Sequence, residues 1–150
     1  MIKFNLNKKS KLGGLIMALL LCCTCLQAAG YFTLAMDTVN GTVGQTVNVP
    51  VTVQNFVEMI SAQGTINFDT SELQFVQVSR LGLSSLSNGN FGLNGAPAGY
   101  ITFSWTDPTL NGTSLADDSV FFALEFRVKA TACKNTALSF GNTPTLLEWV

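Results

Sequence analysis

The stretch that decides the fold is Thr46-Val-Asn-Val-Pro-Val-Thr-Val-Gln54. Its four valines, at positions 47, 49, 51 and 53, alternate with other residues, so an extended chain would be apolar on one face and mostly polar on the other. The stretch therefore predicts a half-buried β-strand. Pro50 lies on the polar side, and because proline lacks the N–H that a ladder requires, we expect this strand at a sheet edge.

Short apolar alternations, separated by Gly, Asn, Asp, Ser and Pro, continue along the chain from Phe32 onward, and no window of helical period exceeds a turn or two. Further strands are predicted at 32–39, 60–68, 73–79, 100–106 and 120–130. The Ser-, Asn- and Gly-rich residues 84–99 hold either one irregular strand near Asn90–Asn94 or a loop. We therefore expect an all-β sandwich or barrel.

Alternation also predicts the core. The inward side chains of the best-defined strands are expected to form one inter-sheet core: Val47, Val49, Val51, Val53, Phe103, Trp105, Phe122, Leu124 and Phe126. With Trp105 inside, the candidate exposed rings are Tyr100 and either Phe91 or Trp149. Sugar-binding surfaces use flat exposed rings, and no strip of them is predicted.

The first 29 residues have the features of a secretory signal peptide. Four lysines precede an apolar stretch, Leu15–Leu26, which ends in small residues. This stretch is shorter than the roughly 20 residues that cross a bilayer, which makes a membrane anchor the weaker alternative. We expect cleavage after Ala29, which removes three of the four cysteines. The product would be a secreted chain, extracellular or at the cell surface and free of the membrane, with one domain over residues 31–150.

The residues after Gly30 point away from catalysis. The chain has no histidine, which removes the commonest general base and the commonest zinc ligand. Cys133 would have neither a disulfide partner nor an imidazole to activate it, and we interpret it as a spectator thiol. Four basic residues against nine acidic ones give a net charge of −5, which disfavours nucleic acid as a partner.

Paired carboxylates are the remaining route to catalysis. The candidates are Asp69, Glu72, Asp107, Asp117, Asp118 and Glu125. The four aspartates lie at predicted turns, where aspartate is favoured for its hydrogen bonds to the backbone, and we interpret them as turn formers. The dense Asp, Asn and Gly spacing of a calcium loop is absent. We expect no catalytic residue, no metal and no cofactor.

Three segments resemble one known family. Asp37-Thr-Val-Asn-Gly-Thr-Val-Gly-Gln-Thr-Val-Asn-Val-Pro-Val-Thr-Val53 is similar to the opening of cohesin modules, where a Gly-x-x-Gly reversal leads into Val-x-Val-Pro-Val. Ile66–Leu73 resembles the family's aromatic-Asp-x-x-x-Leu corner, and Val120–Lys129 its long penultimate strand. The likeness covers residues 32–140. It implies a nine-stranded jelly-roll β-sandwich.

The resemblance also implies a function. Cohesins are non-catalytic receptors for dockerin modules, usually those of polysaccharide-degrading enzymes. On the family pattern, the partner face would combine the strands at 60–68, 100–106 and 120–130. Its expected outward residues are Ser61, Gln63, Thr65, Tyr100, Thr102, Ser104, Glu125 and Arg127. Typical dockerin-binding cohesins present an Asn and an Asp on the third strand, where this chain has Ser61 and Gln63. A carbohydrate-binding or surface-adhesion module is the alternative on the same scaffold.

The resemblance raises a question about the closing strand. Cohesin modules usually end in a strand that pairs with the first one, and this strand is expected to be missing here. Either the chain is a fragment of a longer protein, or Thr145–Val150 folds back as a substitute. Without a closing strand, Phe32 and Leu34 would lie beside an unpaired edge that is prone to pair with other chains.

Overall fold

The computed structural model describes residues 30–129 and 135–150. The predicted signal peptide, residues 1–29, and Cys133 lie outside the described residues. In the described part the regular structure consists of nine strands and two 3₁₀ turns. None of the helices found there is long and apolar enough to cross a membrane.

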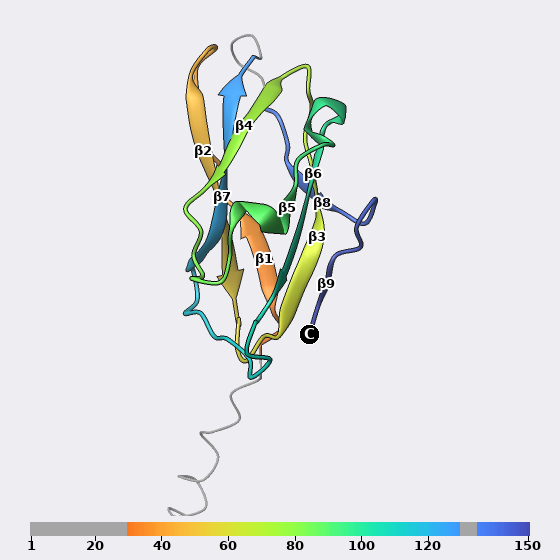
Figure 1. Ribbon diagram of the computed structural model, residues 1–150. Coiled ribbons are helices and arrows are strands. Elements are labelled where there is room, and N and C mark those ends of the chain that lie inside the picture. Colours follow the sequence, from red (N-terminus) through yellow and green to blue (C-terminus); the bar gives the residue numbers. More distant parts are fainter. Residues whose placement is uncertain (1–29, 130–134) are drawn as a thin grey trace, which may run out of the picture. The chain divides into compact units, whose positions relative to one another are not determined.

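The strands form two antiparallel sheets that face each other (Figure 1). The β2 sheet has the order β1-β2-β7-β4, with β1 at Thr33–Met36, β2 at Thr46–Gln54, β7 at Val120–Val128 and β4 at Leu73–Ser79. The β6 sheet has the order β5-β6-β3-β8, with β5 at Phe91–Gly92, β6 at Tyr100–Thr106, β3 at Ser61–Asn67 and β8 at Ser139–Gly141. The short β9, Glu148–Trp149, also pairs with β3. The predicted nine-stranded β-sandwich is confirmed.

Strand β2 has the predicted bounds, but its predicted place at a sheet edge is wrong, because it lies between β1 and β7. The reason is local. The β1 ladder ends at the pair Met36↔Val51, and the N–H of Asp37 then donates to the carbonyl of Pro50 at 3.3 Å. In a strand the N–H and C=O of one residue point to the same side. The side of Pro50 that lacks an N–H therefore faces Asp37, one residue past the end of β1. The proline therefore interrupts no strand pairing there.

The core lies between the sheets, and all nine residues predicted for it are buried. Phe121, which simple alternation would place outside, is also fully buried. Val51 pairs with Phe122 and Thr52 with Val120, so Phe121 is the extra residue of a β-bulge. Its ring lies 5.6 Å from that of Phe56. The bulge thus brings two consecutive phenylalanines of β7 into the core.

Residues 84–99 contain a short strand, as one of the two interpretations proposed. Strand β5 pairs with β6 and lies between the 3₁₀ turns η1 (Asn88–Asn90) and η2 (Ala96–Ala98). The Nδ2 of Asn90 donates to the carbonyl of Ser104 at 2.9 Å. Phe91, a candidate exposed ring, is instead buried with its centroid 5.0 Å from that of Phe122. This segment therefore covers one side of the core.

The C-terminal residues fold back on the sandwich, but onto β3 and not onto β1. Strands β8 and β9 both pair with β3, and Figure 1 shows the C terminus next to one end of β3. The N–H of Ser61 donates to the carbonyl of Val150, and the N–H of Val150 to the carbonyl of Ser61, each at 3.1 Å. The ring of Trp149 packs edge-on against that of Phe32, the residue before β1, with 5.1 Å between their centroids.

Candidate functional site

The outward side of the β6 sheet brings together six of the eight predicted partner residues. The register of β3 and β6 pairs Gln63 with Ser104 and Thr65 with Thr102, and places Ser61 and Tyr100 near opposite ends. We call this surface the β6 face, formed by Ser61, Gln63, Asn67, Tyr100, Thr102, Ser104, Thr106 and Glu148 around the buried Thr65. Its side chains carry mainly hydroxyl and amide groups, to which Glu148 adds a carboxylate.

Glu125 and Arg127 do not belong to this face, so their predicted placement is wrong. They lie on β7, which pairs with β2 and β4 in the other sheet. Alternation gives the side of a strand on which a residue lies, but not the sheet that the strand joins. In the β2 sheet the carboxylate of Glu125 accepts hydrogen bonds from Gln77 at 2.8 Å and from Asn48 at 3.5 Å.

Thr65 points outward as predicted, yet it is fully buried. Its Oγ1 donates to the carbonyl of Thr145 at 2.8 Å and accepts from the N–H of Thr145 at 3.0 Å. The segment between β8 and β9 therefore covers Thr65, which leaves it unable to contact a partner directly. This cover was not visible in the sequence, because Thr65 and Thr145 are far apart along the chain.

Sequence reasoning missed three residues of the face, Asn67, Thr106 and Glu148, and the last of these changes its charge. Glu148 lies opposite Gln63, whose Nε2 donates to its Oε2 at 3.1 Å. It is the one charged side chain on the described strands of the β6 sheet. The isolated Glu148 gave no pattern from which its pairing with β3 could be read, since only two residues form β9.

A glycine leaves the β5 side of the β6 face without a side chain next to Thr102. Gly92 of β5 lies opposite Thr102, and a Cβ atom added to it would come within 2.3 Å of the Oγ1 of Thr102. Any larger residue would displace the threonine. A partner can therefore approach Thr102 across the β5 side of the sheet without meeting a side chain at position 92.

The family model described as the cohesin domain matches residues 32–146, which is most of the chain. The chain belongs to the cohesin family. Cohesin domains are non-catalytic binding modules, so this chain is classed as a binding module and not as an enzyme.

Several known proteins are similar to this cohesin. It is 28% identical over 119 residues to Cellulose-binding protein A of Clostridium cellulovorans, and the match covers 77% of this chain but 6% of that protein. Among solved structures it resembles the complex of CaCohA2 with a variant of CaDoc0917, at 27% identity and a TM-score of 0.64 over 79% of this chain and 86% of that one; CaCohA2 comes from Clostridium acetobutylicum. The sixth cohesin of Acetivibrio cellulolyticus scaffoldin B, solved with a mutant Cel5 dockerin, is 28% identical with a TM-score of 0.61, covering 76% and 84% of the two chains.

Asp69 and Asp107 form turns, as predicted, whereas Asp117 links two segments that are far apart along the chain. Asp69 accepts from the N–H of Ser71 at 2.7 Å, and Asp117 accepts from the N–H of Asn55, 62 residues away, at 2.7 Å. Asp107 is buried and accepts from the N–H of Gly112 at 2.9 Å. The backbone N–H of Thr109, at 3.0 Å, is the main cause that holds the pKa of Asp107 below its ordinary value. Among residues 30–129 and 135–150, no three potential ligands from His, Cys, Asp and Glu gather closely enough to hold a metal.

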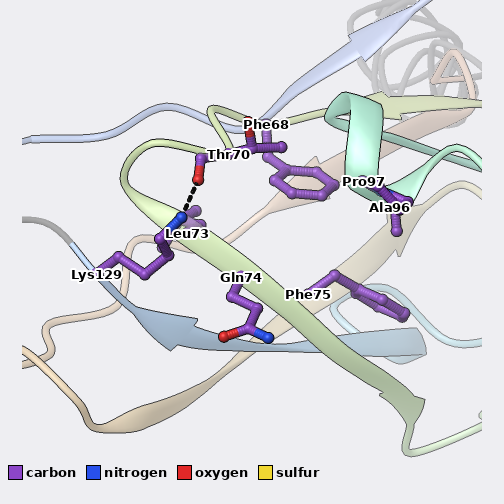
Figure 2. A pocket seen from close by; sticks show the side chains of 8 residues that line it. All are labelled: Phe68, Thr70, Leu73, Gln74, Phe75, Ala96, Pro97 and Lys129. Carbon is purple, nitrogen blue, oxygen red and sulfur yellow. Dashed lines mark hydrogen bonds between the residues drawn. The ribbon is translucent and has the colours of Figure 1, made fainter.

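A hollow beside β4 is a second candidate site (Figure 2). It has a volume of about 440 Å³ and lies between β4 and η2, and Phe68, Phe75 and Pro97 contribute to its mostly apolar lining. The one charged residue in its lining is Lys129, whose Nζ already donates to the carbonyl of Thr70 at 2.6 Å. Among the described residues of this lining there is no carboxylate, and the amine of Lys129 is already engaged, so these residues offer no group poised for catalysis.

Proposed function

We propose that this cohesin is an exported receptor module that binds a dockerin-type module of another protein through the β6 face, and thereby attaches that protein in extracellular polysaccharide degradation. The observation that carries the proposal is the match of residues 32–146 to the cohesin family, joined to a 28% identical cohesin that was solved with a dockerin. The geometry of the β6 face supports the assignment of the surface.

The chemistry of the face suits the centre of a protein interface, because charged residues are depleted there and polar groups must find partners. Thr102 and Ser104 lie on β6, beside β3 at the middle of the sheet. Both carry hydroxyls that can donate or accept hydrogen bonds. Gln63 adds an amide group next to them. A partner with complementary hydroxyl and amide groups would satisfy this surface without burying an unpaired charge.

The departure from the family pattern bears on partner choice. Where typical dockerin-binding cohesins present an Asn and an Asp on the third strand, this chain has Ser61 and Gln63, and its carboxylate comes from Glu148 on the neighbouring strand. The negative charge is thus displaced by one strand. We propose that the matching dockerin places its cation or donor opposite Glu148, and that dockerins selective for an Asp on the third strand bind weakly.

Export is proposed from the leader. The lysine-rich start, the apolar stretch and the small residues near Ala29 support cleavage by a signal peptidase. When the gene is expressed in a secreting bacterium, the chain should appear outside the cytoplasm, and N-terminal sequencing should read from Gly30. A product that retains its leader in the membrane fraction would refute this part of the proposal.

Binding is tested by titration of the purified chain against a panel of dockerins and against insoluble glucans. Saturable capture of at least one dockerin, with no retention on glucan, is the expected result. Saturable retention on glucan without any dockerin signal would favour the carbohydrate-binding alternative and overturn the proposal.

A further inference from the structure

Four Asn-Gly pairs occur along the chain, and their asparagines are Asn40, Asn88, Asn94 and Asn111. In such a pair the backbone nitrogen of the glycine can attack the side-chain amide carbon of the asparagine, because glycine has no Cβ to block the approach. The attack requires that the glycine N–H is unengaged and that the backbone can turn until the two atoms meet. The structure restrains three of the four pairs.

The pair Asn111-Gly112 is held by the buried Asp107. The N–H of Gly112 donates to Oδ2 of Asp107 at 2.9 Å, and the N–H of Asn111 donates to Oγ1 of Thr109 at 3.3 Å. A Cβ atom added to Gly112 would lie 2.7 Å from the carbonyl oxygen of Glu58, so the backbone is closely packed there. Attack by the Gly112 nitrogen would have to break a hydrogen bond to a charged group, which is the stronger kind.

The pairs at Asn88 and Asn94 are held by the two 3₁₀ turns. Asn88 is the first residue of η1, and its carbonyl accepts from the N–H of Phe91. Gly95 precedes η2 and is buried, and its carbonyl accepts from the N–H of Tyr100 at 3.2 Å. A Cβ atom added to Gly95 would lie 2.1 Å from the ring of Tyr100. Neither backbone can turn without breaking these contacts.

The pair Asn40-Gly41 has neither restraint. Both residues are exposed and lie outside regular structure, between β1 and β2. Among residues 30–129 and 135–150, no hydrogen bond involves the side chain of Asn40 or the N–H of Gly41. The nearest backbone N–H groups with partners are those of Asp37, which donates to the carbonyl of Pro50, and of Thr42. The two reacting groups are therefore free to meet.

We propose that Asn40 is a site of spontaneous deamidation, and that the folded domain directs this reaction to Asn40 over the other three pairs. The nitrogen of Gly41 forms a bond to Cγ of Asn40, and the amide nitrogen leaves as ammonia with the proton of the Gly41 N–H. Water then opens the cyclic imide at one of its two carbonyls. Opening at Cγ gives aspartate, and opening at the backbone carbonyl gives isoaspartate. Water is the co-reactant, and nothing is oxidised or reduced.

The products should change the charge and the packing of the domain. Either product replaces a neutral amide by a carboxylate, which is ionised at neutral pH. Isoaspartate also lengthens the main chain by one carbon next to Gly41. An added Cβ atom on Gly41 would lie 2.6 Å from Cγ1 of Val47 and 3.0 Å from Cγ2 of Val128, so there is little room at this position. The isoaspartyl form should therefore melt at a lower temperature than the parent. The proposal does not rest on dockerin binding, since it involves no residue of the β6 face.

Trypsin, which cleaves after Lys and Arg, separates Asn40 from the other three pairs. Positions 12–79 and 81–126 contain no Lys or Arg, so the peptide that ends at Arg80 carries Asn40-Gly41 and the next one, Leu81–Arg127, carries the other pairs. The full chain, expressed with its own leader, is kept in mildly alkaline buffer, folded and unfolded in urea. Incubation continues until both peptides of the unfolded sample have reacted. Mass spectrometry measures the replacement of NH₂ by OH, and fragmentation locates it.

In the folded chain, Asn40 should convert about tenfold faster than Asn111, the factor that corresponds to breaking a hydrogen bond to a charged group. It should also convert faster than Asn88 and Asn94. In the unfolded chain the four rates should be similar, because the pairs share the same local chemistry. Asn40→Gln, whose longer side chain cannot form the five-membered imide, is the matched variant and should abolish conversion in the first peptide alone. A folded chain in which Asn40 does not convert, or in which Leu81–Arg127 converts as fast, would overturn the proposal.

Discussion

Thr65 and Thr145 exchange two hydrogen bonds through a single hydroxyl, with Oγ1 of Thr65 donating to the carbonyl and accepting from the N–H of Thr145. This pair fastens the segment between β8 and β9 to the middle of β3. The hydroxyl is buried, so the two backbone groups of Thr145 have no simple replacement partner if it is removed.

Thr65→Val should therefore destabilise the domain by about 1–3 kcal/mol, the cost of leaving buried polar groups unpaired. Thr65→Ser keeps the hydroxyl and serves as the control, with a smaller loss expected. Urea denaturation followed by tryptophan fluorescence measures both. Equal stability of the valine variant and the parent would mean that the C-terminal segment does not depend on this contact.

Trp105 tests the core. It is 1% exposed, and its Nε1 donates to Oγ of Ser85 at 2.9 Å. Trp105→Ala should cost about 3–5 kcal/mol, because it removes a large buried aromatic side chain. Ser85→Ala, which removes only the acceptor, should cost about 1 kcal/mol. An unchanged melting curve for Trp105→Ala would indicate an exposed ring, and would revive sugar stacking as a function.

Thr102 tests the partner face. Thr102→Lys should leave the melting temperature close to that of the parent and abolish capture of a dockerin, because the centre of an interface tolerates an unpaired charge badly. Thr52→Lys makes the same change on the outward side of β2, in the opposite sheet, and should leave capture intact. Calorimetric titration compares the two. Native affinity of the Thr102 variant would show that the partner binds elsewhere, for example at the loops.

Asp107 gives a pH dependence. Its pKa is held below the ordinary value of 3.8, foremost by the N–H of Thr109, so the folded state favours the ionised carboxylate. The stability that this group contributes is present above pH 3.8 and is lost as the pH falls through the lowered folded-state pKa. Asp107→Asn should be less stable than the parent at pH 7.

The stability difference between Asp107→Asn and the parent should narrow as the solution is acidified below pH 3.8. Thermal melts at a series of pH values measure this. A difference that stays constant down to the most acidic condition would mean that ionisation of Asp107 is not coupled to folding.

Much of the fold could be predicted because alternation is a local property. The bounds of β2, β4 and β6 were read from the sequence, and so was the burial of Trp105, since each strand carries its own pattern. Phe121 escaped prediction because a bulge reverses the alternation at one residue. A bulge depends on the neighbouring strand, which a single sequence does not name.

The candidate site was predictable only within strands. Most outward residues of β3 and β6 were identified, but Glu125 was assigned to the wrong sheet, because strand order is decided by long-range packing. The cover over Thr65 and the position of Glu148 depend on pairing between segments 80 or more residues apart. Such pairings leave no periodic signal in the sequence.

Pro50 has a consequence for folding fidelity. In the native register β1 ends at Met36, just before the position where Pro50 has no N–H to offer. A slip of one residue would turn Phe32, Leu34 and Met36 out to solvent. A slip of two residues would keep the apolar side chains facing the core. In one direction it would place Ala35 opposite Pro50, and the carbonyl of Ala35 would then lack a hydrogen-bond donor in the middle of the strand. Hydrophobic patterning alone would allow a slip of two residues in either direction. Pro50 destabilises one of these two misaligned registers.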